Sequence, residues 1–174
     1  MLDFLKNGKL LTLMLGHFTV DSYAGIIPVL FPLLIGRFHL SLATVGLVSL
    51  AYTGMASISQ PLFGILADRF GTRFTGVALA WTAATYAVLG FINSFPLLLA
   101  LAFASGLGSG AFHPLGALDV RGLLPAWRRS LGMSVYVSAG TLGLAAGPLI
   151  GILVFGLFGL HGAPGRMRAR ENPA

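Results

Sequence analysis

Long hydrophobic runs make up most of the chain, and short polar or charged segments separate them. Five such runs can be drawn, over residues 10–36, 42–66, 74–92, 95–118 and 131–158. Each is close to or longer than the roughly 20 residues that a helix needs to cross the hydrocarbon core of a bilayer. Barrel strands would instead give alternating segments of about 10 residues. The pattern predicts an all-α transmembrane protein with about five membrane-spanning helices.

Composition strengthens this prediction and excludes other classes of protein. Of the 174 residues, 56% are hydrophobic and only 9% are charged, with a mean hydropathy of +0.86. Soluble domains carry about a quarter charged residues, so soluble enzymes are set aside. The chain has no cysteine, which excludes disulfides and cysteine-rich metal sites. We find no catalytic triad, phosphate-binding glycine loop or zinc motif, and we predict no enzymatic activity, cofactor or metal.

The basic residues alternate between the loops. They precede the first run and fill the second and fourth loops, while the first loop holds one arginine and the third holds no charge. By the positive-inside rule this predicts a cytoplasmic N-terminus in a multi-pass protein of the inner (plasma) membrane. The rule also explains the net charge of +6 better than nucleic-acid binding does.

The C-terminal tail, residues 161–174, departs from this alternation. It follows an odd number of spans and should lie outside, yet it carries three arginines: Arg166, Arg168 and Arg170. Three explanations stay open: the fifth span does not fully cross, the short tail is translocated, or the sequence is a fragment that has lost a sixth helix. We favour a fragment, in which residues 1–160 form a partial transmembrane domain.

A charged turn with glycines at both ends joins the second and third runs. Its sequence, from Gly64 to Arg73, is GILADRFGTR, and its charged residues are Asp68, Arg69 and Arg73. Gly71 permits a sharp turn that a residue with a side chain would resist. Solvated charges that stop a membrane span are the simpler explanation.

The turn resembles the loop between the second and third helices of major facilitator superfamily transporters, Gly-x-x-x-Asp-Arg-x-Gly-x-Arg. The resemblance implies that Asp68 faces the N-terminal end of a helix in the transporter's other half and holds the cytoplasmic side closed. Thr72 stands where the family often has a basic residue. Arg69 or Arg73 would then supply the pairing charge, and Asp119 would receive it.

The fifth run contains glycines four residues apart, which form one smooth helix face: Gly143, Gly147 and Gly151. Pro148 removes a backbone hydrogen bond and favours a bend. The string resembles the Gly-x-x-x-Gly-Pro-x-x-Gly motif in the fifth helix of drug–proton antiporters of the same superfamily. The resemblance implies that this face meets the other half of an exporter. Ordinary glycine packing within one half is the alternative.

His17 and Asp21 lie four residues apart in the first run, so they share a helix face. Asp21 lies near the bilayer midplane, where a carboxylate is costly and is by default a functional residue. It is a candidate proton carrier, substrate contact or both. The alternative is a structural pair between Asp21 and His17 or a backbone group.

His113 follows a run of close-packing glycines in the fourth span. Together with His17-Phe18 and Asp21, the segment around His113 resembles the fosmidomycin-resistance branch of the superfamily. Ala102 stands where many antiporters carry an intramembrane arginine, which leaves His17, Asp21 and His113 as the candidate proton or substrate residues. For His113 alone, a structural role is equally compatible with the sequence.

These resemblances identify the chain as an incomplete N-terminal half of a major facilitator superfamily transporter. They imply proton-coupled efflux of a small molecule across the lipid bilayer, with a missing C-terminal half or a second chain as partner. We expect the half to be inactive alone. The alternative is a non-transporting membrane subunit that pairs with or regulates a full-length transporter. We expect no nucleic-acid partner.

Overall fold

The structure is a computed structural model that describes residues 6–88 and 91–158. Five α-helices follow one another: α1 (Gly8–Phe38), α2 (Leu42–Phe70), α3 (Thr75–Val88), α4 (Phe95–Leu123) and α5 (Arg129–Phe158). A short 3-10 helix, η3 (Ala126–Arg128), leads into α5. The all-α membrane fold expected from the hydrophobic runs is therefore confirmed.

Four of these helices are long and apolar enough to cross a membrane within the described ranges: α1, α2, α4 and α5 with its leading turn. Of the third expected span, over residues 74–92, the structure describes helix α3 with 14 residues, and residues 89 and 90 lie outside the described residues. The tail at residues 161–174 lies outside the described residues.

Local side chains mark where the helices begin and end. The Asn7 side chain accepts hydrogen bonds from the amides of Lys9 and Leu10 at the start of α1. Ser41 caps α2 in the same manner, because its hydroxyl accepts from the amide of Thr44. Gly71 ends α2 with a positive φ of 73°, and its amide donates to the carbonyl of Ala67. The sharp turn expected at Gly71 is thus present.

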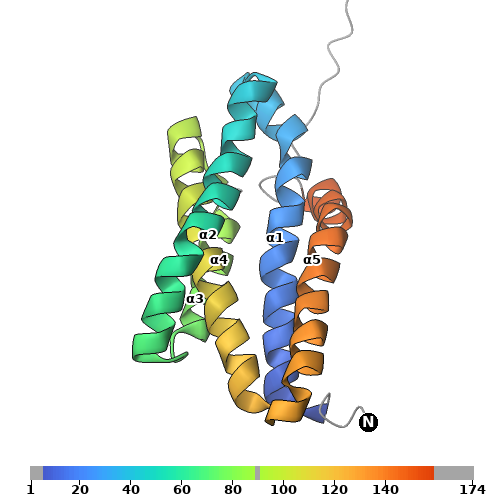
Figure 1. Cartoon of the computed structure of the whole chain (residues 1–174). Coiled ribbons are helices and arrows are strands. Elements are labelled where there is room, and N and C mark those ends of the chain that lie inside the picture. The colour runs from blue at the N-terminus through green and yellow to red at the C-terminus, as the bar shows by residue number, and fades with distance from the viewer. Residues whose placement is uncertain (1–5, 89–90, 159–174) are drawn as a thin grey trace, which may run out of the picture.

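The helices pack as two close pairs. Helix α1 makes its most extensive contacts with α5, and α2 makes its most extensive contacts with α4. Helix α3 packs on α4, and α4 also touches α1 (Figure 1). The start of α1, the α2–α3 turn and the α4–α5 connection all lie at the lower end of the bundle in this view.

Glycines bring the paired helices together. On α4, Gly106 and Gly110 lie against the backbone carbonyls of Tyr52 and Ala56 in α2. On α5, three glycines face α1: Gly143 meets the Phe18 backbone, Gly147 meets Ser22 and Gly25, and Gly151 meets Ile26 and Val29. Helices in lipid have no hydrophobic driving force toward one another, so close packing at small residues helps to hold them together.

The glycine face of α5 is therefore occupied by α1 of the same chain. Gly143, Gly147 and Gly151 are buried, whereas Pro148 is exposed. Packing within the chain, the alternative left open by the sequence, is present at these three glycines. A contact between this part of α5 and a second half of the transporter stays a prediction.

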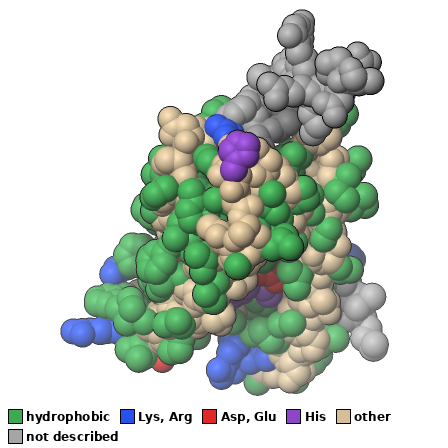
Figure 2. Space-filling model, turned by 90° about the horizontal axis from the view of Figure 1, so that it is seen from above, with side chains coloured by type: hydrophobic (Ala, Val, Ile, Leu, Met, Phe, Trp, Pro, Cys, Tyr) green, Lys and Arg blue, Asp and Glu red, His purple; other side chains and the backbone are tan. Residues whose placement is uncertain are grey.

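Large apolar side chains cover much of the outer surface, among them Leu15, Ile58, Ile65, Leu142 and Leu157. Figure 2 shows hydrophobic side chains spread over the face in view, with basic side chains near its edges. In water such a surface would favour aggregation, whereas lipid tails cover it at no comparable cost. The fold thus suits a bilayer.

Gly147→Ala should destabilise the α1–α5 pair. A Cβ at Gly147 would lie 2.6 Å from the Ser22 carbonyl oxygen and 2.8 Å from the Gly25 Cα, so backbone must move. Overpacking of this kind costs about 1–3 kcal/mol. Gly156→Ala is the matched control on the same helix, since nothing lies within 4 Å of its Cβ position. Urea unfolding in detergent measures both, and equal midpoints would contradict the close contact.

Candidate functional site

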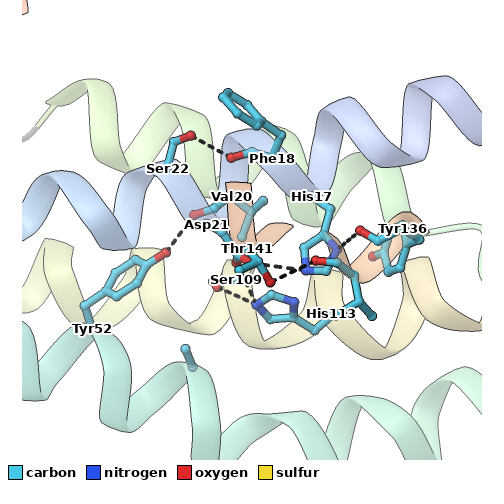
Figure 3. Close-up of polar contacts among 12 residues, drawn as sticks. His17, Phe18, Val20, Asp21, Ser22, Tyr52, Ser109, His113, Tyr136 and Thr141 are labelled. Carbon is cyan, nitrogen blue, oxygen red and sulfur yellow. Dashed lines mark hydrogen bonds and ion pairs between the residues drawn. The ribbon is translucent and has the colours of Figure 1, made fainter. Parts of the chain in front are cut away.

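His17 and Asp21 of α1 meet His113 of α4 in the interior of the bundle. The Nε2 atom of His17 lies 3.3 Å from Oδ2 of Asp21, and the Nε2 atom of His113 lies 3.4 Å from Oδ1 of the same carboxylate. Figure 3 shows both imidazole rings directed at this carboxylate. The structure therefore brings together all three residues that the sequence singled out as proton or substrate candidates.

The cluster lies deep within the membrane-spanning part of the chain. Asp21 is about 20 Å along α1 from its first residue, in a helix about 46 Å long. The side chain of His17 is 9% exposed, whereas those of Asp21 and His113 are 22% and 23% exposed. Figure 2 shows a small acidic and histidine surface in a hollow between hydrophobic side chains. The Asp21 and His113 side of the cluster is therefore accessible from outside the chain.

A backbone carbonyl fixes the orientation of His17. Its Nδ1 atom lies 3.0 Å from the Tyr136 carbonyl oxygen, which belongs to α5. A carbonyl oxygen only accepts hydrogen bonds, so Nδ1 carries the proton in this contact. The Nε2 atom then faces Asp21 either as a lone pair or as a second N–H.

The contact between His17 and Asp21 is a close approach of Nε2 to a carboxylate oxygen, at 3.3 Å. With a proton on the imidazole it would be an ion pair, because the protonated ring is a cation and the ionised carboxylate an anion.

Three further residues complete the surroundings of the cluster, and the sequence did not single them out. The Tyr136 ring lies 4.3 Å from the His17 ring, between centroids. Ser109 Oγ lies 3.4 Å from His113 Nε2. A Cβ at Gly140 would lie 2.5 Å from both Asp21 Oδ2 and His17 Nε2, so a larger residue there would displace the ends of these two side chains. Gly140 lies three residues before Gly143 on the same helix face, a signal that the sequence already contained.

The cluster also has the composition of a metal site. One ligand atom from each of His17, Asp21 and His113 lies within 4.8 Å of the others. The sequence predicted no metal, because no tight ligand spacing joins residue 113 to the first helix. In the structure, α4 packs on α1 and brings His113 close to His17 and Asp21, although they are far apart in the sequence.

The residues of the charged turn lie apart from this cluster, at the end of α2. Asp68 is exposed, and Gly64 and Gly71 have open space at their Cβ positions. Arg69 lies over the Phe70 ring, and Arg73 lies over the rings of Phe70 and Phe74.

Asp119 does not form the expected ion pair with Arg69 or Arg73 among the described residues. Its Oδ2 atom instead accepts a hydrogen bond of 2.7 Å from the Thr75 hydroxyl at the start of α3. The contact fastens the first turn of α3 to the last part of α4. The arginines point to neighbouring rings because these are within reach in the same turn.

The tautomer of His17 is open to direct measurement. With histidine labelled by ¹⁵N in the purified chain, His17 should keep a protonated Nδ1 in both the wild-type protein and the Asp21→Asn variant, because the Tyr136 carbonyl holds it. A neutral His17 protonated at Nε2 alone in the variant would contradict the assigned contact.

Comparison with known proteins agrees with this architecture. The family model described as Major Facilitator Superfamily matches residues 13–165. The chain is 32% identical over 149 residues to the "Uncharacterized MFS-type transporter YfnC" of Bacillus subtilis (strain 168), covering 84% of this chain and 36% of that protein. It is 26% identical over 153 residues to the "Fosmidomycin resistance protein" of Escherichia coli (strain K12), covering 87% of this chain and 37% of that protein.

A more distant similarity is to the "MFS-type transporter calB" of Penicillium decumbens, with 29% identity over 127 residues, 72% of this chain and 22% of that protein. No solved structure gives a significant match. The chain thus spans little more than a third of the length of the Bacillus subtilis and Escherichia coli relatives. Its helical membrane fold and the match over nearly its whole length lead to one conclusion: the chain belongs to the Major Facilitator Superfamily.

Proposed function

We propose that the chain forms part of a transporter that exports a small molecule in exchange for protons, and that the coupling proton resides on the His17–Asp21 pair. The single observation that carries this proposal is the hydrogen bond from His17 Nδ1 to the Tyr136 carbonyl. It leaves Nε2 for Asp21, whose Oδ2 atom lies 3.3 Å away, so a proton shared by the two side chains would hold them together. An ionisable pair so deep in the membrane is by default functional.

His113 supplies the link between this proton and a substrate. Its Nε2 atom approaches the other carboxylate oxygen of Asp21, at 3.4 Å, from a different helix. Movement of α4 relative to α1 would change this contact while the His17–Asp21 contact, within one helix, persists. Protonation of Asp21 and the relative position of the two helices are therefore coupled through one carboxylate.

The remaining parts of the proposed cycle involve a second half. In the proposed orientation the N-terminus lies in the cytoplasm of a cell with an inner membrane, and the charged turn faces the same side. Asp68 is exposed and has no ion pair within the described ranges, which leaves its carboxylate available to a helix N-terminus in another domain. Exposed Pro148 is the part of the α5 motif still available to such a partner.

Fosmidomycin is a suitable first probe, because one relative is named for resistance to it. We expect cells that express the chain together with the coding sequence adjoining its gene to tolerate several-fold more drug than cells that express the chain alone. Equal tolerance would contradict the need for a second half. Co-purification with a full-length transporter, without any change in export on deletion, would favour a regulatory subunit instead.

Asp21→Asn in that two-part system should abolish drug-driven proton movement, because an amide cannot take up the proton that His17 shares. A pH-sensitive dye in everted membrane vesicles measures the movement. His39→Asn is the matched control: it removes an exposed imidazole from a residue with a φ of 53°, which asparagine tolerates. Proton movement that survives Asp21→Asn would exclude the assigned role.

A further inference from the structure

We propose that His17, Asp21 and His113 bind one divalent transition-metal ion of the Zn²⁺ or Co²⁺ class, with a fourth coordination position left open. This site goes beyond the proposed transport function and does not depend on it. It is made of two imidazole nitrogens and one carboxylate oxygen, from two helices, in the interior of the bundle.

The distances suit such an ion. Bonds from Zn²⁺ to nitrogen or oxygen are about 2.0–2.2 Å, so neighbouring ligand atoms of a tetrahedral site lie about 3.4 Å apart. The Nε2 atom of His17 lies 3.3 Å from Oδ2 of Asp21, and the Nε2 atom of His113 lies 3.4 Å from Oδ1 of the same carboxylate. One ligand atom from each residue lies within 4.8 Å of the other two, so the three side chains are close enough to approach one ion.

The hydrogen bond between Nδ1 of His17 and the Tyr136 carbonyl is of the kind that metal-binding histidines form. Such histidines donate the N–H of their second ring nitrogen to a carbonyl or carboxylate, which fixes the ring and directs the other lone pair at the metal. His17 donates Nδ1–H to the Tyr136 carbonyl and presents Nε2 to the cluster. His17 and Asp21 are also four residues apart on one helix face, a spacing that recurs in helical zinc sites.

The chemistry of the ligands selects the class of ion. Imidazole favours zinc, cobalt, nickel and copper over the hard ions magnesium and calcium, which prefer oxygen ligands alone. Three protein ligands leave a position for water or another small ligand, as in catalytic zinc sites. The partial exposure of Asp21 and His113 provides the route of entry.

The metal ion would bind the same atoms that share the proposed proton, the Nε2 atom of His17 and a carboxylate oxygen of Asp21. A metal binds the neutral imidazole and the ionised carboxylate, so it replaces the proton between His17 and Asp21. An ion held there would also join α1 to α4. Zn²⁺ is therefore expected to block any movement of these helices that depends on Asp21.

Co²⁺ titration of the purified full chain tests the site directly. For this titration the chain is purified with an affinity tag that contains no histidine. The visible absorption of the bound Co²⁺ reports how much of it has bound. We expect saturation at one ion per chain, displacement by Zn²⁺, and a loss of affinity of more than about 10-fold in Asp21→Asn and in His113→Gln. The matched controls His39→Asn and His161→Gln should bind as the wild type does.

A variant that replaces one metal ligand by another distinguishes loss of the site from misfolding of the chain. The chain has no cysteine, so a Co²⁺–thiolate absorption band in His113→Cys can arise only from the new side chain. We expect that band, together with retained binding. Absence of Co²⁺ binding in the wild type, loss of binding in His161→Gln, or no thiolate band in His113→Cys would each overturn the site. None of these outcomes bears on proton coupling, which is measured separately by transport.

Discussion

The close contact between α1 and α5 is the constraint on which the rest of the structure depends. Gly143 and Gly147 let the backbone of α1 approach at the level of Phe18 and Ser22. This approach brings the Tyr136 carbonyl within 3.0 Å of His17 and leaves no space for a side chain at Gly140. Backbone packing thus determines which way an ionisable ring points.

A second glycine contact completes the site from the other direction. Helix α4 packs against α2 through Gly106 and Gly110, and α4 also touches α1, where His113 reaches Asp21. The Asp21 carboxylate consequently lies where the α1–α5 pair meets the α2–α4 pair, with His17 on its own helix and His113 on α4.

Sequence reasoning predicted the helices and part of the site. Hydrophobic length predicted α1, α2, α4 and α5, and the four-residue spacing of His17 and Asp21 predicted their contact. It also predicted a third span over residues 74–92, of which residues 75–88 form α3. Sequence reasoning also left open which helix packs on the α5 glycines, because the spacing of glycines does not identify the helix that contacts them.

The rest of the site depends on contacts between distant segments. The acceptor for His17 is a backbone carbonyl, which every residue has, so Tyr136 carries no distinguishing signal in the sequence. Asp119 was expected to pair with an arginine on the basis of charge, yet the Thr75 hydroxyl lies closer once α3 packs on α4. Infrared difference spectroscopy of the purified chain against Asp21→Asn tests the central claim most directly. A proton shared by His17 and Asp21 predicts, at neutral pH, either a protonated carboxyl band or imidazolium bands that vanish in the variant. An ionised carboxylate beside a neutral imidazole at neutral pH would contradict it.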